Sequence, residues 1–151
     1  MAVINGELSG FELKSDSDTL KRLPYQAEIY GKVFDRMTLV VGRKHYADAI
    51  ERIPDWWSCI VAEMREGKVL LTSKKRGRKN PRLDPFVVAQ LLWKDEAIEA
   101  LAKHNLAEGW RTRRADEISN RLVSELPLKV LTAHVREALK IRPKLGQLGS
   151  C

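Results

Sequence analysis

The chain has 151 residues, of which 44% are hydrophobic and 31% charged, and its formal net charge is +7. This length suffices for one domain with a buried core, and the longest apolar runs fall far short of the roughly 18 residues of a membrane helix. Because Cys59 and Cys151 lack framework spacing and Glu7 interrupts any leader, we expect a cytoplasmic protein with free thiols, neither a disulfide scaffold nor a membrane protein.

The first half of the chain alternates predicted strands and helices. A short strand over 2–4 ends at Asn5-Gly6, a dipeptide typical of tight hairpin turns, and a second strand follows over 10–14. Later elements are a helix over 24–34, a strand over 38–42, a helix over 46–53, and a hairpin of strands 58–62 and 68–72 that turns at 66–67. Strand, helix and strand through 10–42 predict a parallel crossover. The fold class is therefore α/β, a mixed β-sheet flanked by helices.

The second half predicts a helical C-terminal region. Asp84 is a cap residue and Pro85 fits the first helical position, with apolar residues at helical spacing continuing to Asn105. Further helices are expected over 114–126 and 127–141. The domain organisation is then an α/β core over 1–73, a basic linker loop over 74–83, a helical domain over 84–141 and a disordered tail over 142–151.

The positive charge lies entirely in the second half. Residues 1–73 carry 10 basic and 11 acidic side chains, whereas residues 74–151 carry 17 and 9. The basic residues at the start of this half, over 74–82, form a run without an acidic residue. Such a run is typical of an exposed loop that binds a polyanion, although a solvated linker is the competing interpretation. The candidate nucleic-acid contacts are Lys74, Lys75, Arg76, Arg78, Lys79 and Arg82, with a weaker cluster of Arg111, Arg113 and Arg114.

Few other residues form a pattern that indicates a catalytic or metal-binding site. Glu12 and Lys14 are two apart in a predicted strand, so both project from one face, where a simple surface ion pair is the plainest interpretation. The three histidines are scattered without metal-ligand spacing, and we expect them to be structural or on the surface; they are His45, His104 and His134.

The order of these elements resembles the PD-(D/E)XK nuclease superfamily. A hairpin whose second strand carries Glu-x-Lys is followed by a helix with Gln26 and Tyr30, similar to the Gln-x-x-x-Tyr motif of the RecB-like branch. Gln26 and Tyr30 share one helix face. Segments 2–6, 10–16, 33–42 and 80–85 are together similar to an uncharacterised family of bacterial and phage proteins, over nearly the whole chain.

The resemblance implies a restriction-endonuclease-like core that cleaves DNA with Mg²⁺ or Mn²⁺. Glu12 would bind the metal, with the Leu13 carbonyl as a possible further ligand, and Lys14 would orient or deprotonate the attacking water. Gln26 and Tyr30 would support the site or contact the nucleic-acid backbone. Such a metal polarises a phosphoryl oxygen and lowers the pKa of its bound water.

The sequence departs from that family pattern at its beginning. The superfamily places an acidic metal ligand, usually aspartate, on a strand ahead of the segment that matches 2–4, and here the chain starts with Met1. We therefore expect an N-terminally truncated core with weak activity or none.

Three functions compete. The first is a metal-dependent nuclease acting on DNA, the second a non-catalytic DNA-binding module on the same fold, and the third a structural or interaction protein. Metal binding separates the first two, and salt-dependent DNA affinity separates both from the third. The sequence does not indicate the oligomeric state.

Overall fold

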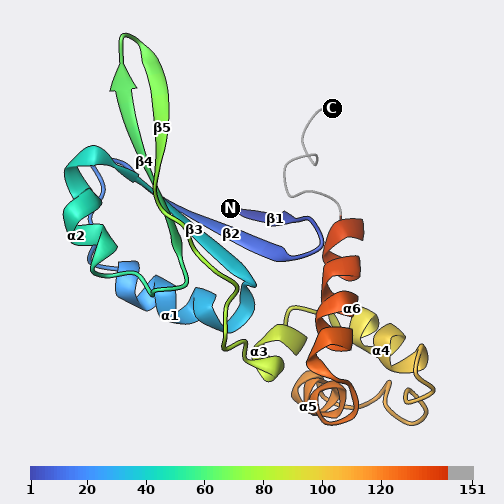
Figure 1. Cartoon of the computed structure of the whole chain (residues 1–151). Coiled ribbons are helices and arrows are strands. Elements are labelled where there is room, and N and C mark those ends of the chain that lie inside the picture. The colour runs from blue at the N-terminus through green and yellow to red at the C-terminus, as the bar shows by residue number, and fades with distance from the viewer. Residues whose placement is uncertain (143–151) are drawn as a thin grey trace. The chain divides into compact units, whose positions relative to one another are not determined.

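The computed structural model of the chain, in which residues 1–142 are described, divides into two compact units. The first is Met1–Leu83 and the second begins at Asp84 (Figure 1). Each unit is described by itself. The first is a sheet with helices, and the second is helical.

The first unit is built on a five-stranded mixed sheet in which the strands follow chain order. Strands β2, β3 and β4 are parallel to one another, and β1 and β5 are antiparallel to their neighbours at the two edges. The α/β class and the parallel pairing of β2 with β3 are thus confirmed. The strands are β1 Ala2–Ile4, β2 Leu8–Lys14, β3 Arg36–Gly42, β4 Ser58–Arg65 and β5 Lys68–Lys75.

Both predicted hairpins form, and glycine explains why. Gly6 lies between β1 and β2 with φ +70°, and Ile4 pairs with Leu8 across the turn. Between β4 and β5, Glu66 and Gly67 have φ values of +51° and +74°. Two consecutive residues at positive φ match the right-handed twist of paired strands, and glycine reaches this region without a steric penalty.

Helices cover one face of this sheet and build its core. Helix α1 (Leu23–Val33), a 3₁₀ turn (Arg43–His45) and α2 (Tyr46–Ile50) connect the parallel strands, and Figure 1 shows α1 below them. Alternate residues of β3 and β4 point toward the helices, as strand geometry requires. The buried cluster includes Leu23 and Ala27 of α1, Ala49 of α2, Met37, Leu39 and Val41 of β3, and Trp57, Cys59 and Val61 beside or within β4.

The opposite face of the sheet, here called the open face, bears no part of that core. Strand register places four hydroxyl side chains, one arginine and a row of apolar side chains on it, and the apolar ones near the β4–β5 turn are more than half exposed. The open face consists of Val3, Ser9, Phe11, Leu13, Arg36, Thr38, Val40, Ser58, Ile60, Ala62, Met64, Val69, Leu71 and Ser73.

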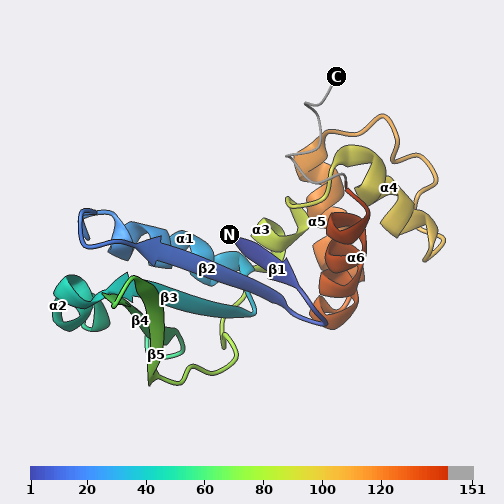
Figure 2. The same cartoon turned by 90° about the horizontal axis from the view of Figure 1, so that it is seen from above.

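The second unit contains four described helices, seen from above in Figure 2. The Asp84 carboxylate accepts hydrogen bonds from the backbone N–H groups of Phe86 and Val87, which confirms it as the predicted cap. Asn105, at φ +59°, follows the end of the second helix as predicted. The helices are α3 Pro85–Ala89, α4 Lys94–Ala102, α5 Ala115–Glu125 and α6 Leu128–Ile141.

Three expectations need correction or completion. The helical pattern from Asp84 to Asn105 is interrupted between α3 and α4, because Trp93 adopts an extended conformation and its N–H is capped by the Glu96 carboxylate at 2.7 Å. Lys74 and Lys75 belong to β5 and are not in a loop. Arg142, assigned to the tail, is anchored in the second unit, whereas 143–151 and Cys151 lie outside the described residues.

Two remaining features of the described residues concern the hydropathy of the helices and the thiol of Cys59. None of the helices in residues 1–142 is both long and apolar enough to cross a bilayer. Cys59 is a free thiol buried in β4, and this burial raises its pKa. A protonated, inaccessible thiol is inert, so Cys59 belongs to the core.

Candidate functional site

The four side chains that the sequence singled out as a site do converge in the first unit. The Lys14 ammonium lies 2.7 Å from Oε1 of Glu12, and only 7% and 12% of these two side chains are exposed. Nε2 of Gln26 donates to the same oxygen at 2.9 Å, and the Tyr30 hydroxyl donates to Oε2 at 3.2 Å. This set, here called the polar cluster, lies between β2 and α1.

Local periodicity explains the convergence. Glu12 and Lys14 are two apart in β2 and face α1, while Gln26 and Tyr30 are one turn apart in α1 and face β2. The Tyr30 ring stacks on Trp57 of the core at 6.4 Å between centroids. Burial, followed by the Glu12 charge, raises the pKa of Tyr30 above its usual range. The hydroxyl therefore stays protonated and acts as a donor.

The polar cluster does not fit a magnesium or manganese ion. Such hard cations need several free oxygen ligands, often from two carboxylates. Here both oxygens of Glu12 already accept hydrogen bonds, and one of them also lies beside an ammonium. Among the described residues, no group of three or more histidine, cysteine, aspartate or glutamate side chains is arranged to hold a metal. The geometry is that of a paired, structural network, in which Oε1 of Gln26 is buried without a hydrogen-bond partner.

The cationic stretch 74–82, here called the basic segment, is fastened to the first unit instead of hanging free. Its backbone crosses the beginning of β4, where the Gly77 N–H donates to Oγ of Ser58 at 3.0 Å and the Arg78 N–H donates to the Trp56 carbonyl at 2.9 Å. Asn80 closes the segment: its N–H donates to the Asp35 carbonyl, and its buried amide donates to the carbonyls of Gly31 and Phe34 at 2.7 and 2.9 Å.

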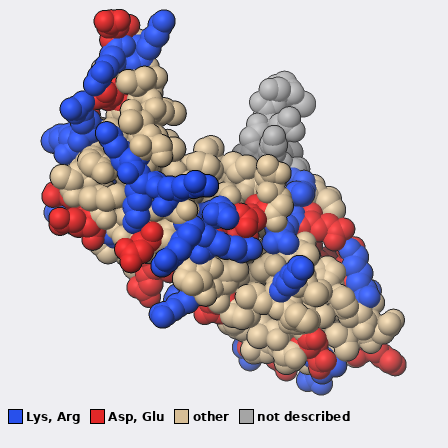
Figure 3. Space-filling view, viewed as in Figure 1, with Lys and Arg blue, Asp and Glu red and all other residues tan. Residues whose placement is uncertain are grey.

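This anchoring holds cations at the surface. The exposed members of the segment are Lys74, Arg76, Arg78, Lys79 and Arg82. Of these, only Lys79 forms an ion pair within the described part of the chain, with Glu7 at 3.4 Å and Asp35 at 4.0 Å. Lys75 donates to the Pro54 carbonyl at 3.1 Å. Figure 3 shows lysine and arginine gathered on this side of the first unit, with acidic side chains beside some of them.

The weaker arginine cluster has a different environment. Arg113 pairs with Glu117 at 3.7 Å and Arg114 with Asp116 at 3.2 Å, so acidic residues of the first turn of α5 offset both. The Arg113 guanidinium also lies 5.8 Å from the centre of the Trp110 ring. Arg111 is exposed. The two paired arginines have less charge to offer a polyanion than the basic segment.

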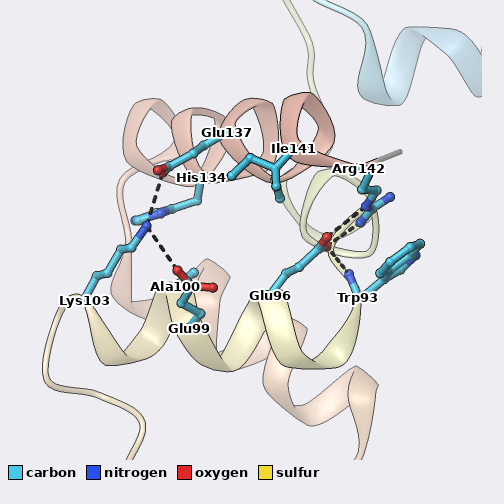
Figure 4. Close-up of a pocket in the computed structure, with 10 residues that line it drawn as sticks. Trp93, Glu96, Glu99, Ala100, Lys103, His134, Glu137, Ile141 and Arg142 are labelled. Atoms are coloured by element: carbon cyan, nitrogen blue, oxygen red, sulfur yellow. Dashed lines mark hydrogen bonds and ion pairs between the residues drawn. The ribbon is translucent and has the colours of Figure 1, made fainter. Parts of the chain in front are cut away.

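Sequence reasoning missed a cluster around Arg142 in the second unit (Figure 4). Arg142 makes a two-pronged contact with the Glu96 carboxylate, donates to the Leu91 carbonyl at 2.7 Å, and lies 4.2 Å from the centre of the Trp93 ring. The hydrogen bond from Arg142 lowers the pKa of Glu96. No local pattern predicts this cluster, because Arg142 lies about fifty residues along the chain from the residues that it contacts.

A second unexpected pair joins two of the histidines. Nε2 of His104 lies 2.9 Å from Nε2 of His134, thirty residues along the chain, with the rings nearly perpendicular. Burial, followed by the charge of His104, lowers the pKa of His134. A hydrogen bond between two imidazoles needs one ring to be a neutral acceptor, so this pair is incompatible with double protonation.

Comparisons with known proteins place the chain in a family. Residues 1–145 match the family model described as "Bacteriophage P4 protein cII". A curated relative, Protein cII of Enterobacteria phage P4, is 28% identical over 142 residues, which cover 94% of this chain and 53% of the relative. The chain thus spans about half the length of that relative, and no solved structure matches it. Because the family model covers nearly the whole chain, the chain belongs to the bacteriophage P4 protein cII family.

The expected membership of the PD-(D/E)XK superfamily is therefore wrong. The family match includes every segment on which that resemblance rested and assigns the chain to a different family. The expectation of a missing N-terminal aspartate depended on the superfamily pattern and is withdrawn with it. Glu12, Lys14, Gln26 and Tyr30 do meet, but their catalytic roles came only from the resemblance, and their geometry is explained by burial and pairing.

Proposed function

We propose that this member of the bacteriophage P4 protein cII family is a nucleic-acid-binding module that contacts the DNA backbone through the basic segment. One observation carries the proposal: a run of cations is fastened by backbone hydrogen bonds to the sheet and α1, and Arg76 and Arg78 have no ion pair among the described residues. Holding the segment in place lowers the entropy lost when a ligand orders it.

Charge chemistry favours a polyanion as the partner. Arginine and lysine neutralise phosphates and release condensed counterions, which gives affinity without sequence preference. Contacts of these cations with phosphates would position the protein on DNA and carry no sequence information. A general DNA-binding surface is the function that this charge distribution favours.

Nuclease activity remains a prediction and ranks second. It requires a metal bound near Glu12, and that carboxylate is already shared among Lys14, Gln26 and Tyr30. A binding function needs no rearrangement of the polar cluster, and this favours it over cleavage.

The test is the salt dependence of DNA binding. In fluorescence anisotropy on a short duplex, the double variant Arg76→Ala/Arg78→Ala should bind more weakly, and the slope of log K against log[salt] should fall by about 1.8 because two phosphate contacts are lost. Arg113→Ala/Arg114→Ala removes the same charge from ion-paired positions and should change the slope by much less.

Two results would contradict the proposal. If both double variants lower the slope equally, net charge and not the anchored segment attracts DNA. If wild type binds no more tightly at low salt than at high salt, the protein is not a DNA-binding module at all. A plasmid-nicking assay with Mg²⁺ and Mn²⁺ on the same samples, with Glu12→Gln for comparison, decides whether cleavage accompanies binding.

A further inference from the structure

His104 and His134 bring two imidazole nitrogens together at the surface of the second unit. Their Nε2 atoms lie 2.9 Å apart, and the two rings are nearly perpendicular. His104 is exposed and His134 is partly buried, so a small ion can reach both nitrogens from solvent. The pair plays no part in the proposed DNA binding, because the basic segment belongs to the first unit.

Both rings are carried by backbone that other contacts hold in place. His104 lies in the turn that follows α4, where its N–H donates to the Leu101 carbonyl at 3.0 Å. His134 lies on α6, which is packed into the second unit through the buried side chains of Leu131 and Val135. Ligands on such fixed elements lose little conformational freedom when an ion binds, and this favours binding.

The charges around the pair favour a cation. Lys103 lies 3.5 Å from Glu99 and 3.3 Å from Glu137, and Figure 4 shows the His134 ring beside these side chains. One positive and two negative charges leave a net of −1 next to the imidazoles. Burial, followed by the charge of His104, lowers the pKa of His134, so this ring stays in the neutral form that binds metal ions.

We infer that His104 and His134 form a two-histidine site for a divalent transition-metal ion such as Zn²⁺, with water in the remaining positions. Imidazole nitrogen suits Zn²⁺, Cu²⁺ and Ni²⁺, whereas Mg²⁺ and Ca²⁺ require oxygen ligands. Zinc binds histidine nitrogen at about 2.0–2.1 Å, which places two such nitrogens about 3.3 Å apart in a tetrahedral site. The Nε2 atoms, now 2.9 Å apart, therefore have to separate by only about 0.4 Å.

The site is expected to hold its ion weakly and reversibly. Resident zinc sites have three or four protein ligands, and within residues 1–142 no histidine, cysteine, aspartate or glutamate side chains form a set of three or more that fits a metal. A bound ion would replace the hydrogen bond of the pair with a bridge between the end of α4 and α6. Binding should therefore stabilise the second unit in proportion to the free ion present.

Metal entry moves one proton within the pair. Without metal, one ring donates its Nε2–H to Nε2 of the other ring. When an ion binds both Nε2 atoms, this proton transfers through water to Nδ1 of the same ring, so both ligands are neutral imidazoles and no net proton is released at neutral pH. In acid, protons compete with the ion for the same nitrogens, and affinity should fall as the pH drops below the ordinary histidine pKa of about 6.5.

Calorimetric titration of the full chain with Zn²⁺ alone tests the site. Wild type should bind Zn²⁺, and an excess of Mg²⁺ should not displace it. His104→Ala should weaken binding by at least about tenfold, because even residues that only support a metal ligand cost this much when lost. His45→Ala removes an imidazole of the first unit and should bind Zn²⁺ like wild type. If His104→Ala does not fold, judged by circular dichroism, His134→Gln replaces it.

NMR and urea unfolding locate the ion independently of its affinity. On addition of Zn²⁺, the imidazole resonances of His104 and His134 should shift or broaden, while those of His45 stay unchanged. Zn²⁺ should also raise the urea midpoint of wild type but not that of His104→Ala.

Three results would overturn the inference. They are a wild type that binds no Zn²⁺, equal Zn²⁺ affinity in wild type and His104→Ala, and displacement of Zn²⁺ by Mg²⁺, which would indicate oxygen ligands. The inference is independent of the proposed DNA binding, because Arg76→Ala/Arg78→Ala should bind Zn²⁺ like wild type and His104→Ala should bind DNA like wild type. Loss of one property without the other therefore identifies which of the two proposals has failed.

Discussion

The carboxylate of Glu12 and the ammonium of Lys14 lie 2.7 Å apart on the helix-covered face of β2, almost entirely removed from water. Burying two charges is costly unless they are paired and their remaining hydrogen-bonding groups are satisfied. Gln26 and Tyr30 supply the missing donors to Glu12. The pair and its two partners therefore stabilise the first unit, and they also fix how α1 lies on the sheet.

Removing one charge of this pair should destabilise the first unit strongly. Lys14→Met leaves Glu12 buried without its cation, and we expect a loss of about 3–5 kcal/mol in the free energy of unfolding. Glu12→Gln/Lys14→Met, with no charge left, should lose less than Lys14→Met alone. Urea unfolding followed by circular dichroism measures both.

The exposed pair Glu28–Lys32 provides the control for this prediction. Its side chains are 70% and 45% exposed and 3.9 Å apart, so Lys32→Met should cost under about 0.5 kcal/mol. An equally small loss for Lys14→Met would mean that the polar cluster is not a structural network.

Gly77→Ala should weaken DNA binding although no cation is removed. A Cβ at this position would lie 2.5 Å from the Trp56 carbonyl oxygen and 2.6 Å from the Ser58 nitrogen, so the basic segment would have to leave its place. We expect several-fold weaker binding in the same anisotropy assay, because a released segment loses more entropy on binding. Gly31→Ala, whose Cβ meets nothing closer than 3.9 Å, is the control. Unchanged affinity for Gly77→Ala would show that only the number of cations matters.

Arg142→Ala should destabilise the second unit in a pH-dependent way. The variant loses the paired contact with Glu96 and the bond to the Leu91 carbonyl, and we expect about 2–3 kcal/mol at neutral pH. Because the folded pKa of Glu96 is lowered, its contribution is present above the unfolded pKa of about 4.3 and is lost as the pH falls through the folded pKa.

Denaturant unfolding at several pH values, followed by tryptophan fluorescence, checks this prediction. Wild type should lose stability in acid more steeply than Arg142→Ala, since the variant has already lost the interaction that lowers the pKa of Glu96. Lys140→Ala, at an exposed position of α6, should behave like wild type. Parallel pH profiles for wild type and Arg142→Ala would contradict the proposed coupling.

The histidine pair should titrate as a coupled unit. In wild type the folded pKa of His134 is lowered by burial and by His104, with Lys103 acting in the same direction and Glu137 and Glu99 opposing it. Its contribution to stability is thus present above the unfolded pKa of about 6.5 and is lost as the pH falls through the folded pKa.

Substitution of His104 tests this coupling directly. His104→Ala should raise the pKa of His134 toward its ordinary value, because the neighbouring charge is gone, and NMR titration of the imidazole resonances measures it. Lys129→Ala, at an exposed position of the helix that carries His134, should leave the titration of His134 unchanged. If His134 titrates identically with and without His104, the two rings do not interact in solution.

Local signals in the sequence determined the elements and several of their ends. Gly6 and Gly67 permit the positive φ angles of the two hairpin turns, and Asp84 caps α3, because turn and cap chemistry depend on residues adjacent in the chain. The period of two in a strand placed Glu12 and Lys14 on one strand face, and the helical period placed Gln26 and Tyr30 on one helix face. The prediction that these pairs would meet is correct in geometry, although the family that suggested it is wrong.

Only the tertiary structure decided the contacts between residues far apart in the chain. It fastened the basic segment to Ser58 and Trp56, brought His104 to His134, and set Arg142 against Glu96 and Trp93. Periodicity states which side of an element a residue faces, but the partner opposite depends on how separate elements pack. That packing follows from burial summed over many side chains, so whether a cation is pinned or free is a property of the whole unit and not of its segment.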